Sequence, residues 1–260
     1  MKIRLHQFLS KSGIFTSKAK VKESIWEGKI TINGVIIKNM SYEFNPNKKK
    51  VIYDNKIIKL PQKESYFLLN KPLGFICSRL NSQEIKLAKK SVYELFRDET
   101  SATVYKSLIT VGRLDENTTG FLLVTTDGKL VHKITNPENN IKKTYYIETT
   151  ESITKEQINS IKNGVQISVK DNGVIVEEYI TRPAILSNIK EFSMEITIDE
   201  GKKREIRRML TSLGNEVKKL HRLSTENMLL SDFNIDFGEY CEIDIREINV
   251  NIFNNIESDR

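Results

Sequence analysis

Residues 112–128, with the sequence GRLDENTTGFLLVTTDG, constrain the fold of this chain more than any other stretch. The apolar run FLLVTT lies between a polar loop and an Asp-Gly turn, which is the pattern of a short buried strand bounded by turn signals. A single aspartate, Asp115, lies in the polar loop beside Arg113 and shortly before this strand. Asp115 could cap a turn between two strands, or it could be a catalytic carboxylate held where two strands meet a cleft. The stretch alone leaves both interpretations open.

The composition argues against several classes of protein. No apolar run approaches the ~20 residues that a membrane-spanning helix needs, and the polar, amphipathic N-terminus does not resemble a signal peptide. The two cysteines, Cys77 and Cys241, lie far apart, and the chain has only three histidines. We therefore expect free thiols, a reducing compartment such as the cytoplasm, no membrane partner and no metal site.

The first 58 residues predict a small basic module. They contain twelve Lys or Arg and four Asp or Glu, a net charge of +8, whereas the whole chain carries +7. Apolar residues at helical spacing predict two short helices, the second capped by Ser17, and Asn33-Gly34 predicts a hairpin after them. Four lysines surround the turn between the helices: Lys11, Lys18, Lys20 and Lys22. This surplus of positive charge indicates a polyanion, with nucleic acid as the leading candidate, or else a solvated basic surface without a partner.

The remainder of the chain predicts a linker and an α+β domain. Residues 59–65, KLPQKES, combine a proline with polar residues and lack periodicity, which indicates a linker. Strand and helix patterns then succeed each other, including a helix from about Ile85 to Arg97.

A second helix of interest is predicted after Gly201, in the sequence KKREIRRMLTSLG. On this helix Arg204, Arg207 and Arg208 would share one face. Three like charges on one face need phosphates or a buried carboxylate as partners, unless the face is simply solvated.

These motifs together resemble those of a pseudouridine synthase of the RsuA-like branch, which carries an RNA-binding module named after ribosomal protein S-four. The basic module resembles that αL RNA-binding motif over roughly residues 3–50. The family signature G-R-L-D-x-x-(S/T)-x-G-L, followed by T-x-D-G, matches residues 112–128, with Phe121 where leucine is usual. Three further motifs match in order: Lys71-Pro72-x-Gly74, Lys143-x-Tyr145, and Glu200 through Met209.

The resemblance implies a fold of the α+β class. A small N-terminal αL RNA-binding module (1–58) and the linker would precede a catalytic domain (66–245) and a C-terminal tail (246–260). The catalytic domain would contain two α+β halves that share one long mixed, mainly antiparallel sheet with a central cleft. The implied reaction converts a uridine already in RNA to pseudouridine without a metal or a cofactor: the C1′–N1 bond breaks, the uracil reorients, and a C1′–C5 bond forms.

The resemblance also assigns roles to residues. Asp115 would carry the chemistry, as a nucleophile at C6 or C1′ or as the base for the 2′ proton, and the sequence leaves these routes open. Arg207 would pair with Asp115 and keep it ionised, and Tyr145 would stack on the flipped-out uracil and assist proton transfer at C5. The other candidates would contact RNA, with Lys71 also shaping the floor of the cleft and with helix packing as the alternative for Arg204 and Arg208: Arg113, Lys71, Arg204, Arg208, Lys11, Lys18, Lys20 and Lys22.

The expected partner is a structured stem-loop of ribosomal RNA, bound by a monomer in the cytoplasm. We expect large-subunit rRNA first and small-subunit rRNA as the alternative. A protein of another class, a non-catalytic RNA-binding or ribosome-assembly factor, could keep the fold and lose the activity. The presence of Asp115, Tyr145 and Arg207 argues against it, because a degenerate relative would be expected to lack at least one of them.

Overall fold

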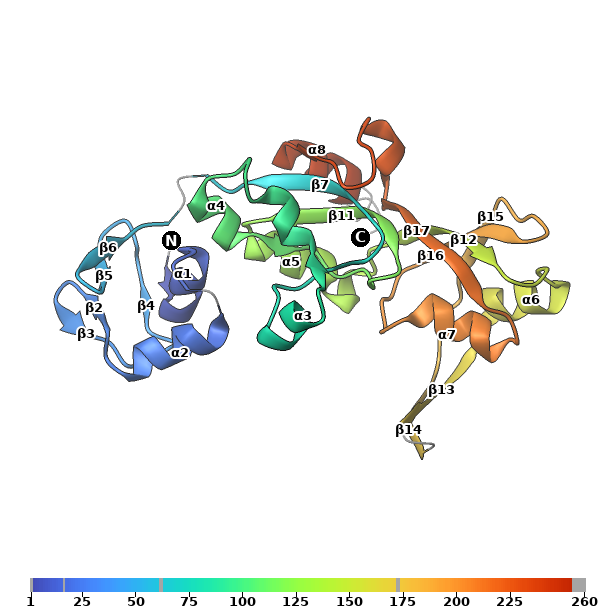
Figure 1. Cartoon of the computed structure of the whole chain (residues 1–260), viewed down its shortest axis with the longest axis horizontal. Helices are drawn as coiled ribbons and strands as arrows, with labels where there is room; N and C mark the ends of the chain where they lie inside the picture. The colour runs from blue at the N-terminus through green and yellow to red at the C-terminus, as the bar shows by residue number, and fades with distance from the viewer. Residues whose placement is uncertain (1, 16, 61–62, 172–173, 254–260) are drawn as a thin grey trace. The chain divides into compact units, whose positions relative to one another are not determined.

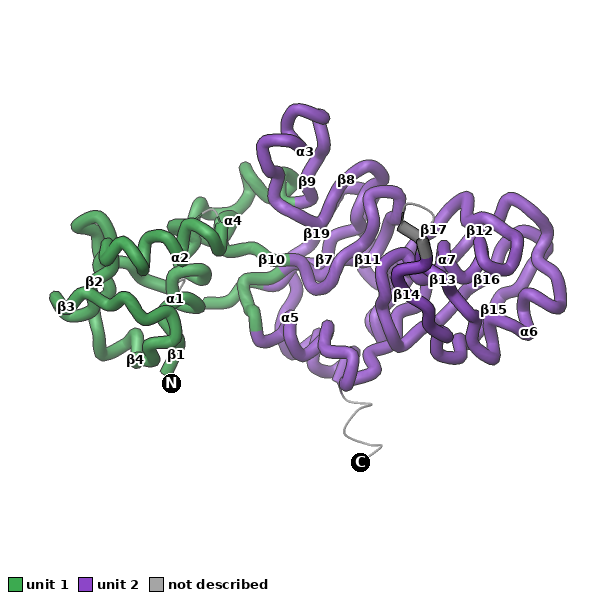
Figure 2. Tube along the Cα trace, turned by 90° about the horizontal axis from the view of Figure 1, so that it is seen from below, with its two compact units in different colours: residues 1–65, 93–109, 125–128 green, residues 66–92, 110–124, 129–260 purple. Residues whose placement is uncertain are grey.

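The computed structural model describes residues 2–15, 17–60, 63–171 and 174–253. The chain divides into two compact units, shown in green and purple in Figure 2. Unit 1 contains residues 1–65, 93–109 and 125–128, and unit 2 contains residues 66–92, 110–124 and 129–260. Part of the expected linker, 61–62, and the end of the expected tail, 254–260, lie outside the described residues. Among those residues no helix is long and apolar enough to cross a membrane.

Unit 1 opens with the predicted basic module (Figure 1). The Ser17 side chain accepts a hydrogen bond from the Lys20 amide and caps the second helix, as predicted. The hairpin turns at Asn33 and Gly34, both of which have positive φ, as a tight primed turn requires. Its strands join a four-stranded sheet of order β3-β2-β5-β6. The elements of this module are β1 (Ile3–Arg4), α1 (Leu5–Lys11), α2 (Lys18–Trp26), β2 (Ile30–Ile32), β3 (Val35–Ile36), β4 (Glu43–Phe44), β5 (Val51–Tyr53) and β6 (Lys56–Ile58).

A long mixed sheet forms the centre of unit 2, with the order β15-β16-β12-β17-β11-β7-β19. Strand β11 pairs with β17 in parallel, whereas β12 pairs antiparallel with both β16 and β17. The prediction of a mixed, mainly antiparallel sheet is therefore confirmed. Its strands are β7 (Tyr66–Lys71), β10 (Ile109–Thr110), β11 (Thr119–Thr125), β12 (Lys143–Thr149), β15 (Ile185–Ser187), β16 (Ser193–Ile198), β17 (Val217–Thr225), β18 (Met228–Leu229) and β19 (Tyr240–Glu242).

The close pairing of β11 with β17 depends on Gly120. Gly120 lies opposite Arg222 in the register, and its φ is +102°. A Cβ at this position would lie 2.3 Å from the carbonyl oxygen of Arg222 and 2.9 Å from its nitrogen. Only glycine therefore allows the loop that carries Asp115 to enter the sheet directly against β17.

Helices and connecting segments complete both units. An apolar core surrounds Phe121 and Leu123 of β11, and it includes Ile248, Ile252 and Phe253 from the segment expected as a tail. That segment therefore begins as packed helix. The remaining elements are β8 (Phe75–Ile76), α3 (Ser82–Lys86), β9 (Lys90–Ser91), η1 (Val92–Phe96), α4 (Ala102–Ser107), α5 (Gly128–Thr135), η2 (Pro137–Asn139), α6 (Lys155–Asn163), β13 (Gln166–Asp171), β14 (Val174–Ile180), α7 (Glu205–Ser212), η3 (Leu230–Asp232), α8 (Ile245–Ile248) and η4 (Asn249–Phe253).

Two helix predictions were wrong in their extent. The helix expected from about Ile85 to Arg97 ends at Lys86, because Ala88 adopts a left-handed conformation with φ +51° and the chain then forms strand β9 against β8. Helix α7 begins only at Glu205, because Arg204 is its left-handed N-cap residue with φ +55°. Arg204 therefore lies outside the helical face that it was predicted to share.

Candidate active site

The loop that carries Asp115 is fastened through its backbone carbonyl groups. The Asp115 carbonyl accepts a hydrogen bond from the Thr118 amide at 3.0 Å, which closes a turn. The Glu116 carbonyl accepts a hydrogen bond from the Gly74 amide at 3.0 Å. The Asn117 carbonyl accepts one from Nη2 of Arg207 at 2.7 Å. The loop is thus held by a turn of its own and by two segments from distant parts of the sequence.

Lys71, at the end of β7, lies beneath this loop with its side chain fully buried. Its Nζ donates to the carbonyl oxygens of Thr118 at 2.8 Å, Pro72 at 3.0 Å and Glu116 at 3.4 Å. Burial lowers the pKa of Lys71 from 10.5 to about 8, and the charges of Cys77, Glu116 and Asp115 partly oppose this. Lys71 was predicted to contact RNA or to shape the floor of the cleft, and its burial agrees only with the second role.

Arg207 and Asp115 are neighbours but do not form the predicted pair of hydrogen bonds. In the described residues the Asp115 carboxylate has no ion pair, and Arg207 donates instead to the carbonyls of Asn117 at 2.7 Å and Val217 at 2.9 Å. Burial lowers the pKa of the Arg207 guanidinium, and the negative charge of Asp115 opposes that shift. The guanidinium therefore bridges the loop to β17, and it still supplies a positive charge close to Asp115.

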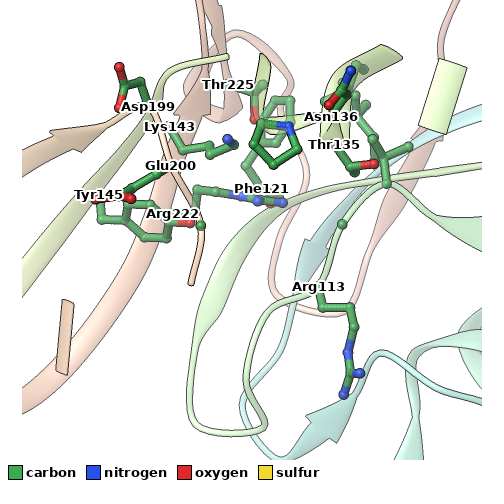
Figure 3. Close-up of a pocket in the computed structure, with 16 residues that line it drawn as sticks. Arg113, Phe121, Thr135, Asn136, Lys143, Tyr145, Asp199, Glu200, Arg222 and Thr225 are labelled. Atoms are coloured by element: carbon green, nitrogen blue, oxygen red, sulfur yellow. The ribbon is translucent and has the colours of Figure 1, made fainter. Parts of the chain in front are cut away.

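A pocket of about 150 Å³ opens beside this loop in unit 2. Figure 3 shows Lys143, Tyr145 and Arg222 grouped on one side of it, whereas Arg113 points away from them. Tyr145 lies opposite Arg222 in the pairing of β12 with β17 and is 9% exposed. Asp115 and Arg207 do not line the pocket, but Arg113, two residues before Asp115, does. Other lining residues supply apolar and acidic groups: Phe121, Leu123, Asp199 and Glu200.

A buried carboxyl group, that of Glu205, neighbours the pocket-lining residue Glu200. Glu205 is 4% exposed, and burial, followed by the effect of the neighbouring Glu200 carboxyl group, raises its pKa to about 8. Its Oε2 accepts a hydrogen bond from the Lys202 amide at 2.8 Å, which fixes the start of α7. These carboxyl groups offer no metal site: within the described residues, no group of three His, Cys, Asp or Glu is placed to hold an ion.

The remaining predicted RNA-binding residues have different surroundings. Lys18 and Lys20 are exposed on α2, and Lys22 lies over the ring of Trp26, 4.1 Å from its centroid. Lys11 instead forms an ion pair with Glu64. In unit 2, Arg204 is exposed and Arg208 is half-buried beside Tyr179 of β14.

Sequence analysis missed two cations that line the pocket. Lys143 was noted only as part of a motif, and Arg222 was not selected at all. A signal for Arg222 was present, because Leu220, Arg222 and Ser224 alternate along β17 and all three are buried. A charged residue at a buried position of an alternating strand is unusual, and it indicates that the side chain has a partner or a ligand there.

Comparisons with known proteins agree with this arrangement. A family model described as RNA pseudouridylate synthase matches residues 65–212, and one described as S4 domain matches residues 3–49. The ribosomal small subunit pseudouridine synthase A of Salmonella typhimurium is 32% identical over 95% of this chain and 98% of its own length; that of Escherichia coli is 30% identical over the same shares. A solved structure titled as a pseudouridylate synthase matches with a TM-score of 0.64 and 27% identity, over 95% of this chain and 98% of that one. The chain belongs to the RNA pseudouridylate synthase family, in its RsuA-like branch with an N-terminal S4 domain.

Proposed function

We propose that this protein converts a specific uridine of small-subunit ribosomal RNA to pseudouridine, with Asp115 as the reacting group. The choice of subunit reverses our sequence-based preference for the large subunit. It is supported by the names of the relatives from Salmonella typhimurium and Escherichia coli, which specify the small subunit.

One observation carries the assignment of Asp115. The loop around it is fastened by Lys71, Gly74 and Arg207, while its own carboxylate is left without a hydrogen bond or ion pair in the described part of the chain. A carboxylate that serves only to cap a turn would accept hydrogen bonds from the backbone. A rigid loop that presents an uncommitted carboxylate beside a positive charge fits a catalytic group.

The reaction requires the target nucleotide to leave the RNA stack, because the glycosidic bond of a stacked base is inaccessible. The flipped uracil would enter the pocket beside Tyr145, whose ring offers a stacking surface and whose hydroxyl can exchange a proton at C5. Asp115 would act on C6, on C1′ or on the 2′ proton, and each route needs an ionised carboxylate. Arg207 places a positive charge close to this carboxylate.

RNA binding would be shared between the two units. The exposed Lys18 and Lys20 of α2 offer positive charge to phosphates of a structured stem-loop, and this contact carries no sequence information by itself. The protein would act as a monomer in the cytoplasm without a cofactor.

The test is release of tritium from 5-tritiated uridine in protein-free transcripts of small-subunit and large-subunit rRNA. Wild type should release tritium from the small-subunit transcript, whereas Asp115→Asn, which keeps the shape and removes the charge, should not. Release from the large-subunit transcript alone would contradict the assigned subunit. Absence of release from both transcripts and from assembled subunits, with RNA binding intact, would support the non-catalytic alternative.

A further inference from the structure

Arg222 is a buried cation whose hydrogen-bonding groups are mostly unused. It is 5% exposed, and its Nε donates to the carbonyl of Phe121 at 2.5 Å. Within the described residues its two terminal Nη atoms donate to no acceptor and form no ion pair. A buried guanidinium normally has its donors satisfied, because burial of unpaired charge is costly. Arg222 lines the pocket of about 150 Å³, and Figure 3 shows its side chain beside that of Lys143.

Lys143 brings a second cation with unused donors to the same pocket. Its Nζ has no hydrogen-bond or ion-pair partner among the described residues, and Figure 3 shows its side chain pointing into the pocket. Burial and, after it, the nearby charge of Arg222 lower the pKa of Lys143 from 10.5 to about 8. Three carboxyl groups oppose this shift from the surrounding elements: Asp199, Glu226 and Glu205.

Two neighbouring cations with unused donors, the two Nη atoms of Arg222 and the Nζ of Lys143, indicate a ligand that supplies negative charge or carbonyl oxygens. The pocket wall also contains Tyr145 and Phe121, which suit a flat ring, and Asp199 and Glu200, which would repel a phosphate. Uracil meets these requirements together, since it is flat, offers the O2 and O4 carbonyls to the cations, and offers an N3–H to a carboxylate.

We propose that Lys143 and Arg222 bind the uracil carbonyl oxygens and stabilise the negative charge that the base carries during isomerisation. The inference rests on the proposed function. When the C1′–N1 bond breaks, its electron pair leaves with the base, and the charge spreads over N1, O2 and O4. An electron pair at C5 then forms the new bond to C1′, the C5 proton is lost to a base, and N1 gains a proton. The two cations stabilise the anion between these steps.

The decisive variant is Lys143→Gln, which removes the charge at similar length. Removing one donor to a developing oxyanion typically slows the chemical step by about 10²- to 10³-fold. We expect a loss of this order in single-turnover pseudouridine formation, with RNA affinity unchanged and a melting temperature no lower than that of the wild type. The matched control is Lys142→Gln, because Lys142 is an exposed neighbour that does not line the pocket.

The pH dependence distinguishes stabilisation of charge from simple packing. The profile of kcat/KM reports the free enzyme. For the wild type it should fall as the pH rises through about 8, where Lys143 loses its proton. In Lys143→Arg the side chain stays charged, so this fall should move to higher pH. An unmoved profile would overturn the role of Lys143.

Other outcomes are equally informative. Weaker RNA binding with an unchanged chemical step in Lys143→Gln would mean that the cations contact a phosphate, and it would overturn the proposal. If wild type formed no pseudouridine on any rRNA substrate, the proposed function would fail, and binding of 5-fluorouracil would decide this inference separately. Fluorine NMR should then show the probe bound to the wild type and to Lys142→Gln, and released by Lys143→Gln. Equal binding to all three, or to none, would refute the uracil site.

Discussion

Replacement of Lys71 by methionine is a sensitive test of how the Asp115 loop is held. The fully buried ammonium donates to the carbonyls of Pro72, Glu116 and Thr118. Its pKa falls from 10.5 in solution to about 8 in the folded protein. At about 1.4 kcal/mol for each pKa unit, keeping this lysine charged costs the folded state roughly 3 kcal/mol.

The sign of the pH effect follows from the proton balance. Between pH 8 and 10.5 the unfolded chain holds a proton on Lys71 that the folded chain has released, so this residue makes the wild type more stable as the pH rises. Lys71→Met lacks that gain. The stability deficit of the variant relative to wild type should therefore widen by roughly 3 kcal/mol between pH 7 and pH 10.5.

Urea denaturation of both proteins at several pH values measures this difference directly. Contributions of other titrating groups are shared by both proteins and cancel in the difference. Lys203→Met, at an exposed position of the same unit, controls for the loss of one lysine. A stability deficit that stays constant over this pH range would refute the reasoning. It would mean that burial does not lower the pKa of Lys71 in the folded protein.

Three further outcomes are expected. Gly120→Ala should destabilise the protein by roughly 3 kcal/mol or more in urea denaturation, since its Cβ would lie 2.3 Å from a backbone oxygen, whereas Gly128→Ala should be tolerated. Arg207→Lys keeps the charge but cannot bridge two carbonyls, so tritium release should slow by about tenfold or more while RNA affinity holds. Lys18→Gln should reduce the slope of log affinity against log salt by about one, and Lys11→Gln, which removes a lysine already paired with Glu64, should not.

Local signals in the sequence predicted much of the fold. Ser17 caps a helix and Asn33-Gly34 turns a hairpin because both effects involve only a few neighbouring residues. The helix expected from about Ile85 to Arg97 was wrong for the opposite reason. Its apolar spacing is compatible with a helix, but pairing of Lys90 and Ser91 with β8 is a contact between distant segments, and the left-handed Ala88 accommodates it.

The site shows the same division between local and distant determinants. Asp115 was recognisable because its motif is contiguous, whereas its expected hydrogen bonds with Arg207 were not formed. The Arg207 guanidinium donates instead to the carbonyls of Asn117 and Val217. No sequence pattern predicts these two hydrogen bonds. Motifs thus identified which residues meet, but not which donors and acceptors each one uses.

Arg222 belongs to none of the sequence motifs, yet the sequence contains a signal for it. Its position in the alternation of β17 predicts that it is buried, and a buried arginine needs acceptors for its five donors. The described protein supplies an acceptor for Nε alone, the carbonyl of Phe121. A buried arginine whose donors lack acceptors destabilises the fold, so a purely structural role does not explain Arg222. The unpaired Nη atoms therefore indicate a bound molecule that supplies the acceptors. The alternation predicts where such a residue lies, and the count of its unused donors indicates the chemistry of its ligand.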